Sequence, residues 1–171
     1  MKALTLTCPW AHAIAHWGKL IENRTWAPPR GLIGHRFAIH AGKSPYRLGS
    51  DTRLHIGGRE ADDLAEALDY ARRASGMALD APQVTNGWLH ERSSSILCTA
   101  RLWGWVHVAG TGSSPDMQVH DLLRDNWFVG PYGWVLTDVV TLATPVPCKG
   151  AQGLWALPPD VEAAVMGQVS P

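Results

Sequence analysis

The alternating run over residues 96–108 is the sequence feature that most constrains the fold. Apolar residues stand at nearly every second position and would share one face of an extended strand: Ile96, Cys98, Ala100, Leu102, Val106 and Val108. Gly104 interrupts the run, as glycine does where a strand of a barrel bends sharply. This pattern predicts long strands that curl into a small barrel.

Shorter elements are predicted on both sides of this run. Period-two patterns predict strands at about 2–7, 20–26, 36–40 and 134–142. Helical patterns occur after Pro9, at 59–75, at 117–123 and near the C-terminus, whereas 76–95 resembles a loop. The predicted fold class is therefore α+β, a small β-barrel of about five to six strands decorated by α-helices.

The composition is that of a single globular domain. The chain has 171 residues, 46% of them hydrophobic and 18% charged, and it shows no repeat or interdomain linker. Its apolar runs are shorter than the roughly 18 residues that span a bilayer, so no membrane partner is expected. Pro9, His12 and His16 interrupt any signal-peptide core, and the cysteines are far apart with no CxxC pair. We expect a reducing, cytoplasmic location.

Charge is distributed unevenly although the chain is neutral overall. The first 50 residues hold seven Lys or Arg and one acid, Glu22, for a net charge of +6, and the other 121 carry −6. This asymmetry predicts a basic site built from the N-terminal third. The alternative is that the two sets interleave in space and cancel.

Three charged residues follow Gly18 at strand spacing. Glu22 and Arg24 are two residues apart and would point to one face of the strand, with Lys19 at its entrance. A carboxylate beside two cations stays ionised and orients them, and it can accept hydrogen bonds from base amino groups. The plainer interpretation is an ion pair that braces the barrel.

This stretch resembles the signature of the ASCH domain, a family of PUA-like β-barrels, usually written G-x-K-x-x-E-x-R. Lys19, Glu22 and Arg24 match its charged positions, while Gly18 lies one residue closer to the lysine. Other pieces resemble bacterial and phage members in the same order: Pro9-Trp10, His40-Ala41-Gly42-Lys43, Gly133-Trp134, and Lys149-Gly150 followed by Gln152-Gly153-Leu154-Trp155. Residues 1–171 would then form one ASCH domain with an insertion at about 44–95.

The resemblance implies a cleft beside the first helix that accepts single-stranded RNA or a modified nucleoside or nucleotide. Nine tryptophans are compatible with base stacking, although core packing is the more frequent role of a single tryptophan. We predict that the ligand is bound by the following residues: Trp10, Lys19, Arg24, Trp26, His40, Lys43 and Lys149. His40 is equally compatible with a hydrogen-bonded residue at the end of a strand.

Two other functions remain open at this point. Some ASCH-like proteins hydrolyse N4-acylated cytidine and others are ribonucleases, which would make Lys19 and Glu22 a catalytic pair. Glu22, however, stands where the amidohydrolase branch has a threonine, so the expected hydroxyl is missing. The third possibility is a protein-interaction module that uses surplus tryptophans.

No cofactor is predicted, and a divalent metal belongs only to the ribonuclease hypothesis. His12 and His16 are four residues apart on one helical face and could share a metal ion. With no third ligand nearby in the sequence, a solvated face is favoured and no metal site is predicted. The oligomeric state is left open.

Overall fold

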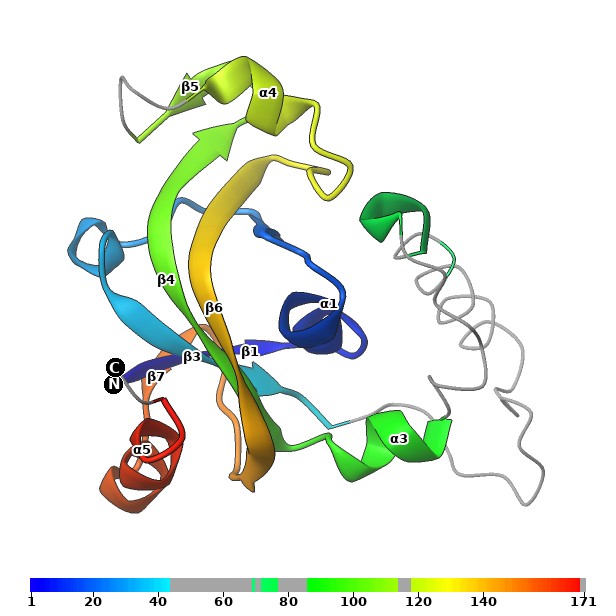
Figure 1. The fold of residues 1–171 in the computed structure, drawn as a ribbon. Helices are drawn as coiled ribbons and strands as arrows, with labels where there is room; N and C mark the ends of the chain where they lie inside the picture. The colour runs from blue at the N-terminus through cyan, green and yellow to red at the C-terminus, as the bar shows by residue number, and fades with distance from the viewer. Residues whose placement is uncertain (44–68, 70–71, 77–85, 114–117, 170–171) are drawn as a thin grey trace.

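The computed structural model describes residues 1–43, 69, 72–76, 86–113 and 118–169. Within them a curled sheet forms a half-barrel with short helices around it, which confirms the predicted α+β barrel-like fold (Figure 1). The seven strands are β1 (Lys2–Leu6), β2 (Ile21–Arg24), β3 (Arg36–Ala41), β4 (Ser95–His107), β5 (Thr111–Gly112), β6 (Tyr132–Pro147) and β7 (Leu154–Ala156). Their order is β2-β6-β4-β3-β1-β7, and β5 pairs with β4.

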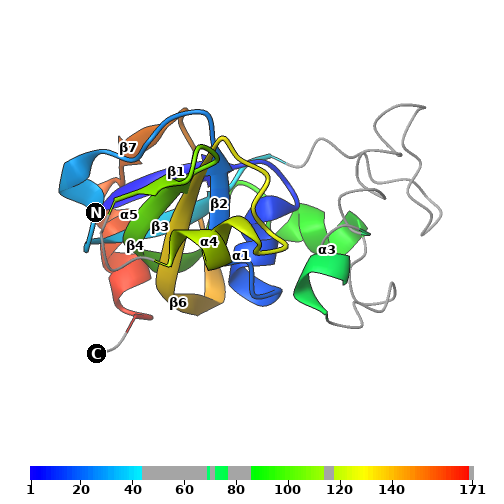
Figure 2. The same ribbon diagram turned by 90° about the horizontal axis from the view of Figure 1, so that it is seen from above.

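Five helices have fully described bounds, and each has one to two turns. They are α1 (Trp10–His16), the 3-10 helix η1 (Arg30–Leu32), α3 (Asn86–Glu91), α4 (Val119–Leu123) and α5 (Pro159–Met166). Helix α1 lies inside the curve of the sheet, and α3 and α5 lie on opposite sides of the molecule (Figures 1 and 2). None of the described helices has the length and apolarity needed to cross a membrane.

The long strand β4 confirms the predicted strand, but not that all of its alternating apolar residues share one face: Val106 packs in a different cluster from Leu102, and Val108 lies beyond the strand and is exposed. The register of β4 against β6 shifts three times, and one of these shifts falls between Leu102 and Gly104, where the glycine was expected to bend the strand. Strand β6 extends to Pro147, well past the predicted end at 142. Strand β2 pairs only with residues 132–135 of β6, so the later part of β6 has no described strand on that side. Pro145 and Pro147, which have no N–H group to donate, are therefore tolerated there.

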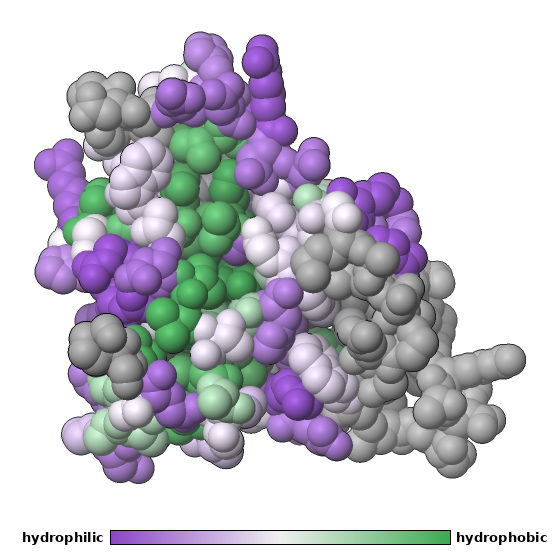
Figure 3. Space-filling model, viewed as in Figure 1, coloured by the Kyte–Doolittle hydropathy of each residue, from purple (hydrophilic) through white to green (hydrophobic). Residues whose placement is uncertain are grey.

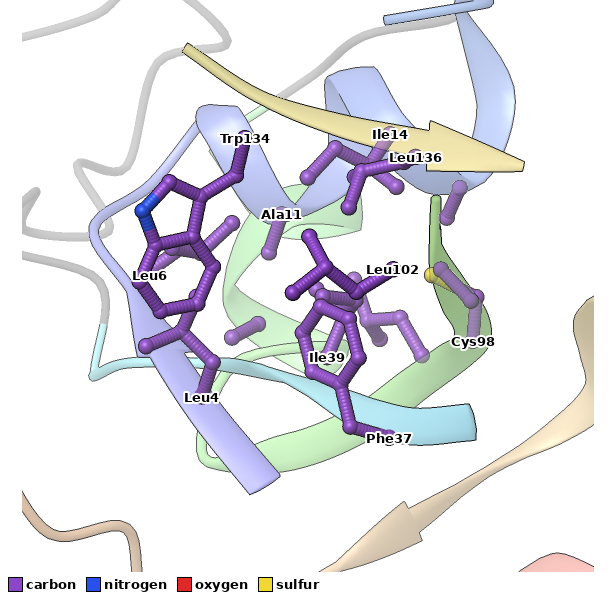
Figure 4. Packing of buried hydrophobic residues seen from close by; sticks show 14 of the residues in the cluster. Leu4, Leu6, Ala11, Ile14, Phe37, Ile39, Cys98, Leu102, Trp134 and Leu136 are labelled. Carbon is purple, nitrogen blue, oxygen red and sulfur yellow. The ribbon is translucent and has the colours of Figure 1, made fainter. Parts of the chain in front are cut away.

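The main core lies between α1 and the concave face of the sheet (Figure 4). Ala11 and Ile14 of α1 pack against Leu4, Phe37 and other strand residues. Trp134 is fully buried in this cluster, and Trp17 is buried in a neighbouring one, as predicted for Trp17. In Figure 3, hydrophobic residues form a band along the sheet over β4 and β6 with hydrophilic residues around it.

The remaining predictions concern the segment at 44–95. The predicted helix at 59–75 falls mostly outside the described residues. The residues of this range that the structure describes, 69 and 72–75, are helical. Helix α3 was not predicted, because its six residues are too few to show a helical period. It is held in place by tertiary packing: Leu89 is fully buried and Trp88 packs beside Trp17 and Ile21.

Candidate functional site

A cleft of about 780 Å³ opens where the ends of β1 and β3 meet the turn before β7. Parallel pairing of β1 with β3 sets Thr5 opposite His40, and the chain beyond each strand forms one wall. The turn 149–153 forms the other wall. The described residues that line the cleft are Thr5, Leu6, Thr7, Arg24, His40, Gly42, Lys43, Ser94, Lys149, Gly150, Ala151, Gln152 and Gly153.

Three cations converge on this cleft. Arg24, Lys43 and Lys149 line it, and no aspartate or glutamate is among the described lining residues. Lys43 and Lys149 are exposed, and neither forms an ion pair within the described part of the chain. A concave site with one sign of charge attracts anions. Two of the three cations come from the basic N-terminal third, as the charge distribution predicted.

Lys19 and Glu22 form a buried ion pair next to Arg24. Lys19 Nζ is 2.6 Å from Glu22 Oε2 and also donates to the carbonyl of Ile21. The two residues are only 2% and 6% exposed, and neither is among the described lining residues. Burial lowers the pKa of Lys19, and the Glu22 carboxylate opposes this shift. The structure therefore brings the proposed catalytic pair together, but below the surface that a ligand reaches.

The turn after α1 explains why Lys19 points inward. Gly18 has a φ of 70°, a left-handed conformation that glycine adopts without a Cβ clash. The chain reverses there, and the amide of Lys19 donates to the carbonyl of Ala13 at 3.1 Å. The reversal directs the Lys19 side chain to Glu22, and the two residues form an ion pair, as in the plainer interpretation of the sequence.

Arg24 connects the buried pair to the cleft. Its Nε is 3.4 Å from Glu22 Oε1, and its Nη2 donates to the carbonyl of Thr5 at 3.2 Å. Its side chain is 23% exposed, and Arg24 is one of the residues that line the cleft. Lys19 thus orients Glu22, Glu22 orients Arg24, and Arg24 presents the charge.

His40 is a neutral, hydrogen-bonded residue in the wall of the cleft. Its Nε2 lies 3.1 Å from the carbonyl of Cys148, which requires a proton on Nε2 and leaves Nδ1 as an acceptor. Burial lowers its pKa, although the Cys148 hydrogen bond opposes the shift. Gly150 packs directly on the ring, since a Cβ there would lie 2.4 Å from His40 Cε1. His40 therefore braces the turn that carries Lys149.

The two tryptophans predicted to bind the ligand lie outside the described cleft lining. Trp10 is partly buried between two hydrophobic clusters. The ring of Trp26 meets Trp134 edge to face at 4.7 Å, and its carbonyl accepts a hydrogen bond from Trp134 Nε1. Of the predicted ligand-binding residues, the structure brings Arg24, His40, Lys43 and Lys149 to the cleft.

His12 and His16 differ in their surroundings, although both were expected on a solvated face. His16 is exposed, but His12 is fully buried against Trp88 at 5.1 Å between ring centroids, because α3 covers this side of α1. Burial, together with nearby His16 and Arg92, lowers the pKa of His12 to about 3. No group of three metal-binding side chains occurs among the residues that the structure describes.

Thr5, Thr7 and Ser94 line the cleft, but the sequence analysis did not single them out. The alternation of threonine with leucine before Pro9 marks Thr5 and Thr7 as one face of a strand. These threonines come next to the residues of β3 only through the parallel pairing of β1 with β3, two segments far apart in the sequence. Local patterns do not reveal such a pairing.

Comparison with known proteins adds no assignment. The chain matches no protein-family model, and a search of curated proteins finds no match. The likeness to ASCH domains therefore rests on the motif residues alone.

Proposed function

We propose that this protein binds single-stranded RNA, with the RNA phosphates in the cleft at the ends of β1 and β3. The observation that carries the proposal is the convergence of Arg24, Lys43 and Lys149 on one concave surface without an acidic residue among its described lining. Phosphate contacts from Lys and Arg supply most of the affinity in sequence-independent binding of nucleic acids.

The size and polarity of the cleft also support a nucleotide-sized ligand. Its volume of about 780 Å³ is within the usual range of small-molecule sites. Thr5, Thr7 and Gln152 offer hydroxyl and amide groups beside the cations. The resemblance of Lys19, Glu22 and Arg24 to the ASCH signature implies the same ligand class, including a modified nucleoside.

The geometry favours binding over hydrolysis at the Lys19–Glu22 pair. A general base must come within hydrogen-bond distance of the proton that it removes. Glu22 is buried, and both of its carboxylate oxygens face the cations of Lys19 and Arg24. This arrangement supports a positioning role for Glu22.

Fluorescence anisotropy with a labelled single-stranded RNA tests the proposal. The variant Lys43→Ala/Lys149→Ala removes two cleft cations, and we expect its affinity to fall at least tenfold, since each charge-assisted contact contributes roughly 1 kcal/mol or more. The matched control Lys2→Ala/Arg30→Ala removes two exposed cations that lie outside the described cleft lining. We expect a change below about twofold for the control. Equal losses in both variants would refute the cleft as the binding site.

A further inference from the structure

A group of three aromatic side chains lies next to Arg24 on the inner face of the sheet. The group, here called the aromatic group, consists of Trp105, His107 and Tyr132. In the strand register, Arg24 of β2 pairs with Tyr132 of β6, which pairs with His107 of β4. Two residues further along each strand, Glu22, Trp134 and Trp105 are aligned in the same way. Residues two apart on a strand share a face, so the aromatic group and the charged motif share one face.

The three rings contact one another. The rings of Trp105 and Tyr132 are 5.5 Å apart in an edge-to-face arrangement, and those of His107 and Tyr132 are 4.5 Å apart. These distances are typical of favourable aromatic pairs, which hold each ring in a fixed orientation. The aromatic group is therefore a preorganised surface.

Exposure distinguishes this group from the core. Trp105, His107 and Tyr132 are each only partly buried, whereas Trp134, on the same face, is fully buried. The core explains Trp134, but it leaves part of each of the other three rings accessible. A partly exposed set of rings can contact a partner with flat, apolar faces.

The position of the group indicates what that partner is. Directly paired residues have Cβ atoms roughly 5 Å apart, so Tyr132 adjoins the arginine that lines the cleft. In an RNA strand each phosphate is followed by a nucleotide whose base can lie beside it. Phosphates at Arg24 would place neighbouring bases beside Tyr132, where base–aromatic stacking is favourable for any base.

We propose that Trp105, His107 and Tyr132 stack the bases of a single-stranded RNA whose backbone is held at Arg24. This inference rests on the proposed function and specifies its ligand as an oligonucleotide with exposed bases, rather than an isolated phosphate or nucleotide. Because stacking is not selective for sequence, the aromatic group extends the site without defining a base preference.

The test compares labelled hexauridylate with a hexamer of the same ribose-phosphate backbone that lacks bases, in the same buffer. The two probes carry equal phosphate charge, so any difference between them measures base contacts. We expect the wild-type protein to bind hexauridylate at least tenfold more tightly. Tyr132→Leu and Trp105→Leu should reduce that preference about tenfold and leave the affinity for the abasic probe unchanged.

Matched controls separate stacking from folding. Trp103→Leu removes an exposed tryptophan of the same strand outside the aromatic group, and the preference should stay unchanged. Tyr132→Phe keeps the aromatic ring, so this variant should also keep the preference for hexauridylate. Equal affinity of wild-type protein for both probes overturns this inference but leaves the cleft proposal intact. This outcome is measured on the wild-type protein alone, so it does not depend on the folding of any variant. Failure of both probes to bind overturns the proposed function and this inference together.

Discussion

Arg24 donates a hydrogen bond from Nη2 to the carbonyl oxygen of Thr5 at 3.2 Å, and so joins two strands that are far apart in the sheet. Strand β2 is at one end of the strand order and β1 is next to the other end. The contact therefore spans the open side of the half-barrel, at the cleft. It links the stability of the fold to the position of a cation that lines the cleft.

The buried ion pair next to Arg24 leads to a prediction about stability. Glu22→Gln would leave Lys19 buried without its charge partner, and we expect the free energy of unfolding to fall by about 3–5 kcal/mol, the range for broken buried pairs. Urea denaturation measures this. In a double-mutant cycle with Lys19→Met, the coupling energy should exceed about 1 kcal/mol. Additive effects would mean that the pair is not coupled.

Binding should weaken with salt in proportion to the cations in the cleft. Each phosphate contact contributes about 0.7 to the slope of log affinity against log salt for single strands, so three cations predict a slope near −2. Lys149→Ala should make the slope shallower by about 0.7, because one contact is lost. Anisotropy titrations at several salt concentrations measure both slopes. Equal slopes for Lys149→Ala and wild-type protein would show that Lys149 does not contact a phosphate.

Gly150 should not tolerate a side chain. A Cβ would lie 2.6 Å from His40 Nδ1 and 2.9 Å from Thr5 Oγ1, so Gly150→Ala should destabilise the protein by about 1–3 kcal/mol through overpacking. In a His40→Ala background the ring is absent, and the same change should cost much less. Thermal or chemical denaturation of the four proteins checks this. An equal cost in both backgrounds would show that the contact with His40 does not set the constraint.

His12 predicts a pH dependence. Its pKa is about 3 in the folded protein and about 6.5 when unfolded. Between these values the unfolded state binds a proton that the folded state excludes, so stability is lost as the pH falls from about 6.5. One such group contributes up to about 1.4 kcal/mol per pH unit. Between pH 6 and 5, His12→Leu should lose stability less steeply than wild-type protein, and parallel curves would contradict this account.

The sequence predicted the elements whose signal is local. The existence of β4 and the irregularity at Gly104 follow from side-chain periodicity and glycine geometry, whereas the change of face that the register shift imposes on Val106 does not. The charged residues that reach the cleft also lie in short motifs, as for Arg24 and Lys43.

What the sequence could not predict depends on contacts between distant segments. The spacing of Lys19 shows that it is near Glu22, but its burial requires the sheet to close over it. His12 is covered by α3, 74 residues or more further along the chain, so its helical position alone gave the wrong environment. The aromatic group can be recognised only when the register between β4 and β6 is known.

The most direct test of the account is an NMR titration of backbone amides in the 15N-labelled protein with single-stranded RNA. We predict that the resonances that shift most come from the described cleft walls: Thr5, Leu6, Thr7, Lys43 and 149–153. Those of α5, on the far side of the sheet from α3, should stay in place (Figure 1). Shifts concentrated on α5, or no shifts at RNA concentrations well above that of the protein, would contradict the claim that this cleft binds RNA.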